Sequence, residues 1–372
     1  MKKIICIFGT RPEAIKMAPV LKELQKKKDL FKTVVVLTAQ HRQMLDQVLR
    51  LFNLQSDYDL NIMQESQSLY YITTSVLSRL RKVINRENPD FILVQGDTTT
   101  TFAAALASFY QKVPVGHIEA GLRSYDRFNP YPEEVNRLLT DALCDFHFAP
   151  TPTAKRNLLK ENIKKESIFV TGNTVIDALY LALKKPHRFR NSLLKKIDFN
   201  KKRIILVTAH RRENWGIPLE NICLSIKKLI KKYDDLEIVY PVHLNPNVKN
   251  VVYKILKNSP RIHLIKPLDY LDFINLMNKC FLVLTDSGGL QEEAPSLGKP
   301  VLVLREVTER PEGVKAGTVK VIGLSKERIF TETCKLLDNR TMYNRMAKSV
   351  NPYGDGNAST RIVNALLYYF KK

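Results

Sequence analysis

The feature that most constrains this chain is a pattern that occurs twice, once in each half. Short β-branched runs end abruptly in small and polar residues, such as Gly-Thr-Arg, Gln-Gly-Asp or Thr-Asp-Ser-Gly. The runs are at 4–8, 34–37 and 91–94 in the first half and at 204–207, 238–240 and 281–284 in the second. Amphipathic helical stretches separate them, which is typical of parallel strands joined by crossover helices. The pattern predicts an α/β fold built from two Rossmann-like halves.

The length of 372 residues also favours two domains, since one domain usually takes roughly 100–200 residues. A charged stretch broken by Pro186 is typical of a surface connection. We therefore expect an N-terminal domain over 1–175 and a C-terminal domain over 176–356. An apolar helix over 357–372 is expected to pack back on the first domain. Ligands of open α/β sheets bind beyond the carboxyl ends of the strands, so we expect the active site in the interdomain cleft.

The charge balance of 59 Lys and Arg against 37 Asp and Glu gives a net charge of +22. Basic pairs are scattered beside apolar helical repeats, so we expect solvated outer faces and no nucleic-acid partner, while an anionic small substrate is compatible. No apolar run approaches the roughly 20 residues of a bilayer span. The N-terminal run stops at Gly9 and predicts a buried strand rather than a signal peptide. We expect a cytoplasmic protein without a membrane partner.

Several cofactor motifs are absent from the sequence. No GxGxxG follows a strand, and neither GxxxxGK[ST] nor HExxH occurs. The five cysteines form no CxxC, and the seven histidines show no metal-ligand spacing. We therefore expect no dinucleotide, metal or redox cofactor.

The sequence Thr-Asp-Ser-Gly-Gly-Leu-Gln-Glu-Glu reads as a strand end, a glycine pair and a helix start. Backbone N–H groups and the helix dipole favour an anion there, and Ser287, Gly288 and Gly289 would let a phosphate approach the backbone. Glu293, about one turn later, can accept hydrogen bonds from ribose hydroxyls. Arg310 is a candidate phosphate partner. A turn that binds nothing and a solvated Arg310 are the alternatives.

The matching turn in the first half reads Gly-Thr-Arg-Pro-Glu-Ala-Ile-Lys. Pro12 suits the first helical position, which leaves Arg11 on the loop and Lys16 one turn later. Together the two cations can gather positive charge at the ligand site. The alternative is that both are ordinary surface charges.

Three carboxylates follow strands in the first half: Asp97, Glu119 and Glu133. Crowding and burial raise the pKa of some carboxyls toward neutrality, which suits proton transfer. The structural alternatives are that Asp97 caps a helix and that Glu119 pairs with Arg123. His210 is the candidate from the second half, and its alternative is a structural histidine.

Eight segments together resemble one family. They are Gly-Thr-Arg-Pro-Glu-Ala-Ile-Lys-Met-Ala-Pro (9–19), Thr-Ala-Gln-His-Arg (38–42), Gly-Asp-Thr-Thr-Thr (96–100), His-Ile-Glu-Ala-Gly-Leu-Arg (117–123), Thr-Gly-Asn-Thr-Val-Ile-Asp-Ala (171–178), Ala-His-Arg-Arg-Glu-Asn (209–214), Asp-Ser-Gly-Gly-Leu-Gln-Glu-Glu-Ala-Pro (286–295) and Thr-Glu-Arg-Pro-Glu (308–312). In this order, from residue 3 to about 370, they resemble the non-hydrolysing UDP-N-acetylglucosamine 2-epimerases of bacteria. The resemblance implies two Rossmann-like domains of the glycosyltransferase-B type with the active site between them, a homodimer and no cofactor.

The resemblance also implies residue roles and an activity. The positions associated with catalysis are Asp97, Glu119, Glu133 and His210. The positions that would bind the UDP-sugar are Arg11, Lys16, Asp97, Glu119, His210, Leu268, Phe273, Ser287, Gly288, Gly289, Glu293 and Arg310. A second UDP-GlcNAc would bind as activator near Gln40, His41 and Gln43. The implied reaction interconverts UDP-GlcNAc and UDP-ManNAc through a glycal, for cell-surface polysaccharide. A hydrolysing 2-epimerase releasing ManNAc and UDP, and a glycosyltransferase on the same scaffold, are the alternatives.

Overall fold

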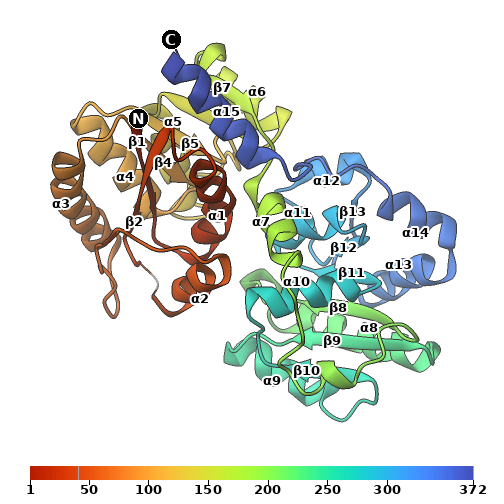
Figure 1. The fold of residues 1–372 in the computed structure, drawn as a ribbon. Coiled ribbons are helices and arrows are strands. Elements are labelled where there is room, and N and C mark those ends of the chain that lie inside the picture. The colour runs from red at the N-terminus through yellow and green to blue at the C-terminus, as the bar shows by residue number, and fades with distance from the viewer. Residues whose placement is uncertain (41, 372) are drawn as a thin grey trace. The chain divides into compact units, whose positions relative to one another are not determined.

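The structure is a computed structural model that describes residues 1–40 and 42–371, without the side chains of 42–44. The chain divides into two compact units (Figure 1). Unit 1 comprises Met1–Ala182 and Tyr353–Lys372, and unit 2 comprises Leu183–Pro352. The expected boundary at 175/176 falls inside helix α7 (Thr174–Leu183), and the units divide between Ala182 and Leu183, at the end of that helix.

Unit 1 is built on a parallel sheet in the order β3-β2-β1-β4-β5-β6-β7. Its strands are β1 (Lys2–Phe8), β2 (Phe31–Leu37), β3 (Tyr58–Asp59), β4 (Phe91–Gln95), β5 (Val115–Ile118), β6 (Phe146–Ala149) and β7 (Ile168–Val170). Its helices are α1 (Arg11–Gln25), α2 (Arg42–Phe52), α3 (Leu69–Glu87), α4 (Thr99–Tyr110), α5 (Glu133–Leu143), α6 (Pro152–Lys160), the 3-10 turn η1 (Lys165–Ser167), α7 (Thr174–Leu183) and α15 (Ala358–Lys371). Ile4 to Phe8 of β1, an interior strand of the sheet, are fully buried or nearly so, which confirms the predicted first strand.

The C-terminal helix α15 belongs to unit 1. The rings of Tyr369 and Phe370 pack edge-on against Phe91 of β4, with centroids 5.6 and 6.1 Å away. At the other end of α15, the buried Asp177 carboxylate of α7 accepts hydrogen bonds from Ser359 N and Oγ. These bonds tie α7 to α15 and explain why the first unit extends to Ala182.

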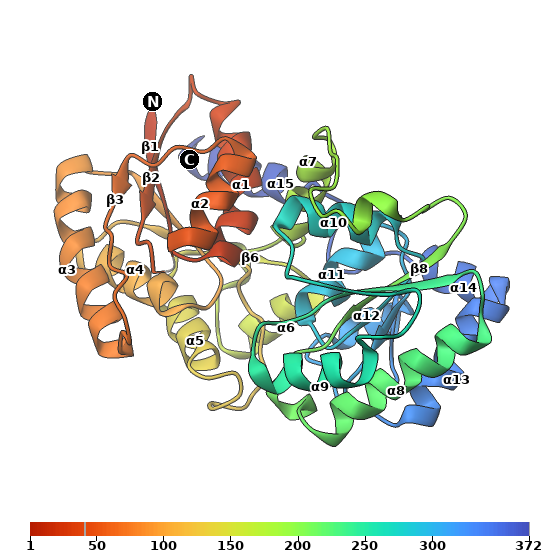
Figure 2. The same cartoon turned by 90° about the horizontal axis from the view of Figure 1, so that it is seen from below.

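Unit 2 repeats the arrangement with a parallel sheet in the order β10-β9-β8-β11-β12-β13 (Figure 1), and Figure 2 shows the same chain from below, with α8, α9 and α13 of this unit labelled. Its strands are β8 (Arg203–Thr208), β9 (Leu236–Pro241), β10 (Ile262–Ile265), β11 (Leu282–Thr285), β12 (Val301–Val303) and β13 (Val319–Val321). Its helices are η2 (Leu194–Lys196), η3 (Arg212–Asn214), α8 (Ile217–Lys232), α9 (Pro246–Leu256), α10 (Tyr270–Lys279), α11 (Gly288–Ser296), α12 (Pro311–Ala316), α13 (Lys326–Asp338) and α14 (Arg340–Ala347). Counted within the unit, the strand order is 3-2-1-4-5-6, the Rossmann order, so both halves have the predicted α/β class.

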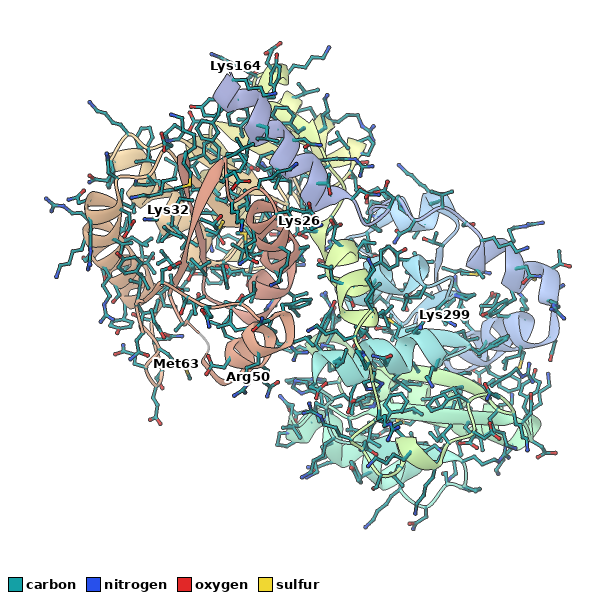
Figure 3. The ribbon with its side chains drawn as sticks, in the orientation of Figure 1. Lys26, Lys32, Arg50, Met63, Lys164 and Lys299 are labelled. Atoms are coloured by element: carbon teal, nitrogen blue, oxygen red, sulfur yellow. The ribbon has the colours of Figure 1, made fainter. Side chains whose placement is uncertain are left out.

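Basic side chains are exposed on the surface of unit 1. Lys26, Lys32 and Lys164, labelled in Figure 3, are all exposed on unit 1. Within residues 1–40 and 42–371, no helix combines the length and the hydropathy needed to cross a membrane.

Candidate functional site

Glu119 lies at the centre of a hydrogen-bond cluster in unit 1. It follows β5 with a φ of +72°, a strained conformation for a residue other than glycine. Lys16 Nζ of α1 lies 2.6 and 2.5 Å from its two carboxylate oxygens. Gln95 Nε2 and Asn173 Nδ2 donate to the same carboxylate at 2.5 and 3.0 Å. The structure thus brings together two predicted site residues, Lys16 and Glu119, and fixes the carboxylate with three side-chain donors.

Asp97 and Glu133 lie next to one arginine. Asp97 follows β4, and its Oδ2 accepts a hydrogen bond from the Arg137 guanidinium of α5. Glu133 begins α5, and burial, together with the charge of Asp97, raises its pKa. The alternative that Asp97 caps α4 is wrong, because Thr98 is the N-cap and accepts from Thr101 N at 3.2 Å. The Asp97 carboxylate is therefore released from a capping role.

The alternative pairing of Glu119 with Arg123 is also wrong. Arg123 donates instead to Asp141 and Glu161, at 2.6 and 2.5 Å. Asp141 also lies 2.6 Å from His117 Nδ1. Burial alone would raise the pKa of Asp141, but His117 and Arg123 outweigh it and lower that pKa to about 2. This buried cluster holds the strand ends from which the catalytic candidates extend.

The remaining candidates of unit 1 lie at the starts of helices. Arg11 is the first residue of α1 rather than a loop residue, and it is half-buried. Gln40 Oε1 accepts from Thr100 Oγ1 at 3.0 Å, at the first turn of α4. His41 and the side chain of Gln43 lie outside the described residues.

Two arginine side chains, Arg211 and Arg310, lie beside the start of α11 in unit 2, and we call this arrangement the cradle. Ser287 is the N-cap, and Gly288 and Gly289 open the helix. A Cβ built on Gly288 would lie 3.9 Å from a guanidinium nitrogen of Arg211 and 3.9 Å from one of Arg310. Free N–H groups, a helix dipole and two guanidinium groups all favour an anion here. The predicted phosphate-binding residues are therefore brought together around Gly288.

The two arginines of the cradle are held by carboxylates. Arg310 Nε donates to Glu292, which is almost fully buried, so Arg310 is not a solvated loop charge. Arg211 Nη2 lies 2.9 Å from Glu309. Glu293, the predicted ribose ligand, is 9% exposed in the second turn of α11. The guanidinium groups are thus oriented before any ligand binds.

His210 follows β8 beside a carboxylate that the sequence analysis did not single out. Asp286 Oδ2 accepts from the N–H groups of His210 and Arg211, at 2.7 and 2.8 Å, and from Asn214 Nδ2 at 3.0 Å. The loop that carries His210 is therefore anchored to the end of β11.

Two positions that the resemblance assigns to the UDP-sugar site, Leu268 and Phe273, lie near the start of α10. Phe273 is half-buried in the first turn of α10, whose N-cap Asp269 accepts from Asp272 N at 2.8 Å. Leu268 is half-buried just before that cap.

Four residues of these clusters were missed as candidates: Arg137, Asn173, Arg211 and Asp286. Three of them stand inside the quoted motifs, directly after strand ends, and that position was the available signal. Arg137 lies four residues after Glu133, so helical spacing places it on the same side of α5.

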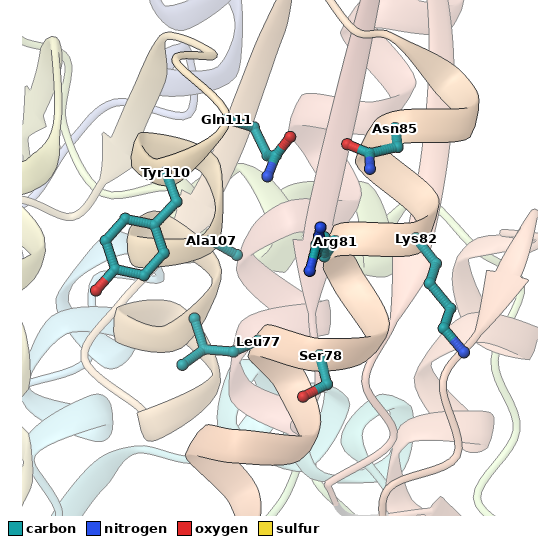
Figure 4. A pocket seen from close by; sticks show the side chains of 8 residues that line it. All are labelled: Leu77, Ser78, Arg81, Lys82, Asn85, Ala107, Tyr110 and Gln111. Atoms are coloured by element: carbon teal, nitrogen blue, oxygen red, sulfur yellow. The ribbon is translucent and has the colours of Figure 1, made fainter.

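Neither of two surface cavities contains a predicted site residue. A cavity of about 470 Å³ lies between α3 and α4, lined by residues that include Leu77, Arg81 and Tyr110 (Figure 4). Another, of about 680 Å³, is lined by residues of the segment before β8 and by Lys279 of α10. Among the described residues, no group of three or more His, Cys, Asp or Glu side chains is placed to hold a metal ion.

Comparison with known proteins identifies the family. The family profile of UDP-N-acetylglucosamine 2-epimerase matches residues 22–367. The UDP-N-acetylglucosamine 2-epimerase of Bacillus subtilis is 53% identical over 368 residues, which are 99% of this chain and 96% of that protein. The crystal structure of the Neisseria meningitidis UDP-GlcNAc 2-epimerase, bound to UDP-GlcNAc, is 54% identical with a TM-score of 0.88, and the match covers 98% and 100% of the two chains.

Two further structures support the same fold. The Staphylococcus aureus MnaA–UDP structure is 52% identical with a TM-score of 0.88, covering 100% of this chain and 97% of that one. Acinetobacter baumannii MurG is 12% identical with a TM-score of 0.62, covering 99% and 100% of the two chains, and shows the fold alone, two Rossmann-like domains of the glycosyltransferase-B type. With a family profile spanning most of its length and relatives above half identity, the chain belongs to the UDP-N-acetylglucosamine 2-epimerase family.

Proposed function

We propose that this protein interconverts UDP-GlcNAc and UDP-ManNAc without net hydrolysis, by inversion at C2 of the sugar. The observation that carries the proposal is the set of carboxylates after β4 and β5 and at the start of α5. Glu133 has a raised pKa, and Asp97 and Glu119 are held by basic and amide donors. Carboxylates in such differing surroundings suit proton removal and return.

The reaction needs an elimination because the C2 hydrogen is not α to a carbonyl. In the first step the C2 proton leaves to a protein base and the C1–O bond to UDP breaks, which gives 2-acetamidoglucal and UDP by anti elimination. In the second step a proton is delivered to the other face of C2, and UDP adds back to C1. Groups on opposite faces of the sugar are required, and we propose that Asp97, Glu119, Glu133 and His210 supply them.

Unit 2 would bind the departing UDP. Breaking the C1–O bond builds negative charge on the diphosphate, and the cradle around Gly288 offers N–H groups with Arg211 and Arg310 already oriented. We propose that Glu293 accepts from the ribose and that Phe273 lines the uracil site. The UDP-GlcNAc and UDP in the related structures support this substrate class.

Three further properties stay predictions from the resemblance: a homodimer, activation by a second UDP-GlcNAc and a role in cell-surface polysaccharide synthesis. The cytoplasmic location stays a prediction from the sequence. The activator site would include Gln40, whose side chain accepts from Thr100 in the first turn of α4.

A proton NMR time course with purified protein and UDP-GlcNAc tests the reaction. We expect UDP-ManNAc to accumulate until a constant ratio is reached. Free ManNAc with UDP would support the hydrolysing alternative instead, and sugar transfer to an added acceptor would support a glycosyltransferase. In heavy water, deuterium should enter C2, because the proton passes to an exchangeable side chain. Full retention of the original hydrogen would exclude the elimination.

A further inference from the structure

Asp286 is a buried carboxylate whose two oxygens have different surroundings. The backbone N–H of Asp286 donates to Thr208 O at 3.1 Å, and this hydrogen bond joins the end of β11 to the end of β8. Oδ2 accepts from His210 N, Arg211 N and Asn214 Nδ2, as described above. A fully buried charge needs such donors, because desolvation of an unpaired carboxylate is costly. The backbone of the His210 loop is thus held by Oδ2.

The other oxygen, Oδ1, is directed at the His210 ring. Oδ1 is buried, and no donor among the described residues forms a hydrogen bond with it, while His210 Nδ1 lies 3.4 Å away. A small rotation of the ring would shorten this distance to a charge-assisted hydrogen bond of about 2.7–2.9 Å. In that bond Nδ1 is the donor, and Nε2 is left free for a ligand.

The rest of the His210 environment is a second histidine ring and solvent. His243, after β9, stacks on His210 with ring centroids 5.4 Å apart and an interplanar angle of 12°. Burial, and then the proximity of His210, lower the pKa of His243, while Asp286 opposes this. The side chain of His210 is 42% exposed and so open to a ligand. His210 therefore contacts His243 and Asp286 Oδ1 and keeps part of its side chain accessible.

We propose that Asp286 is a positioning residue that fixes the Nδ1–H tautomer and the ring orientation of His210. Nε2 then gives or takes the proton, or donates to the diphosphate, at a defined orientation. This inference rests on the proposed function, in which His210 touches the UDP-sugar. Asp286 itself acts only through His210 and its loop.

Nitrogen-15 NMR of histidine-labelled full-length protein tests the pair without any turnover. We expect neutral His210 to carry its proton on Nδ1, and we expect the Nε2–H tautomer to appear in Asp286→Asn, because the carboxylate that accepts from Nδ1 is lost. Asn214→Ala is the matched control, because it removes a donor to Oδ2 but leaves the imidazole contact, and it should leave the His210 tautomer unchanged. An Nε2–H tautomer in the wild-type protein would overturn the proposal even if Asp286→Asn failed to fold.

Kinetics separate a positioning role from a general structural one. We expect Asp286→Asn to lower kcat by about tenfold or more with a smaller change in KM. This loss is smaller than the loss expected when an acid–base group itself is removed. In a His210→Asn background the same substitution should add little further loss. Equal losses in both backgrounds would overturn the proposal. If the wild-type protein does not turn over UDP-GlcNAc, the proposed function fails, and the tautomer of His210 measured by NMR still decides the inference.

Discussion

Lys16 shows how a tertiary contact changes the role of a residue. Its position one turn into α1 suggests a phosphate ligand, like Arg11 five residues earlier. In the structure its ammonium group lies against both oxygens of Glu119. Lys16 therefore neutralises and orients a catalytic candidate, and the cations that we propose for the diphosphate are Arg211 and Arg310, beside Gly288.

Substitution of the carboxylates should separate chemistry from binding. We expect Asp97→Asn, Glu119→Gln and Glu133→Gln each to reduce turnover by ~10² or more while UDP affinity changes little, because the amides keep size but cannot exchange a proton. Arg310→Ala is the contrasting variant and should weaken UDP binding by about 1–3 kcal/mol. Initial rates and calorimetry with UDP measure the two effects. If the amides lose UDP binding as Arg310→Ala does, the division between chemistry and binding is wrong.

Asp141 should contribute to stability in a pH-dependent way. Its pKa is lowered to about 2, so its contribution is present above the unfolded pKa near 4 and is lost as the pH falls toward 2. We expect Asp141→Asn to lower the free energy of unfolding by about 3–5 kcal/mol at pH 7, since Arg123 and His117 lose their buried partner. The gap to wild type should narrow on acidification. Urea unfolding followed by circular dichroism at several pH values measures this.

Asp355→Asn is the control for Asp141. Asp355 pairs with Arg361 at the surface, at 2.7 Å, with both side chains about half exposed. Solvent-exposed pairs contribute about 0–1 kcal/mol, so this variant should differ little from wild type at pH 7. Equal destabilisation in the two variants would contradict the importance of the buried cluster.

At the scale of elements, the start of α11 combines two requirements: room for a ligand and a well-formed helix. In Gly288→Ala the new Cβ would touch Arg211 and Arg310 only at ordinary contact distance, 3.9 Å, so folding should not suffer. Alanine also favours the helix by up to about 1 kcal/mol over glycine. The methyl group would nevertheless lie between the two guanidinium groups, where the diphosphate is proposed to bind. We expect an unchanged or raised melting temperature together with about tenfold weaker UDP binding, 1.4 kcal/mol.

Gly317→Ala provides a contrast, since Gly317 ends α12 with a φ of +75°. There the cost should fall on stability, because left-handed backbone disfavours alanine, and UDP affinity should stay near the wild-type value. Thermal unfolding and UDP calorimetry on both variants decide the matter. A UDP affinity of Gly288→Ala equal to that of wild type would place the diphosphate elsewhere.

At the scale of the whole molecule, unit 1 is completed only by the last helix of the chain. Leu366 of α15 is 1% exposed, whereas Asn364 of the same helix is exposed. We expect Leu366→Ala to destabilise the protein by about 2–5 kcal/mol and Asn364→Ala to change stability by at most about 0.5 kcal/mol. Denaturant unfolding compares them. Equal stability of the two variants would mean that α15 adds little to the core of unit 1.

Most of the strands, and their order along the chain, could be predicted from the sequence alone. Buried β-branched runs and the polar residues after them are local signals, and the predicted runs at 4–8, 34–37, 91–94 and 204–207 lie inside β1, β2, β4 and β8. The end of the first unit at Ala182 could not be predicted in this way. It depends on hydrogen bonds that Asp177 accepts from residues more than 180 positions later in the chain. Sequence composition near a linker carries no information about such a contact.

The sequence by itself determined the α/β class, the doubled architecture and the strand-end segments in which the candidates lie, because each rests on local periodicity and turn chemistry. Only the tertiary structure decided which charges meet. Lys16 and Glu119 are 103 residues apart, and Arg310 and Glu292 are 18 apart. Glu119 and Arg123 are four apart and would meet on a helix, but the segment between them is a turn, so Arg123 pairs with Asp141 instead. Pairing depends on which strand ends become neighbours in the sheet, and that is set by packing of the whole unit.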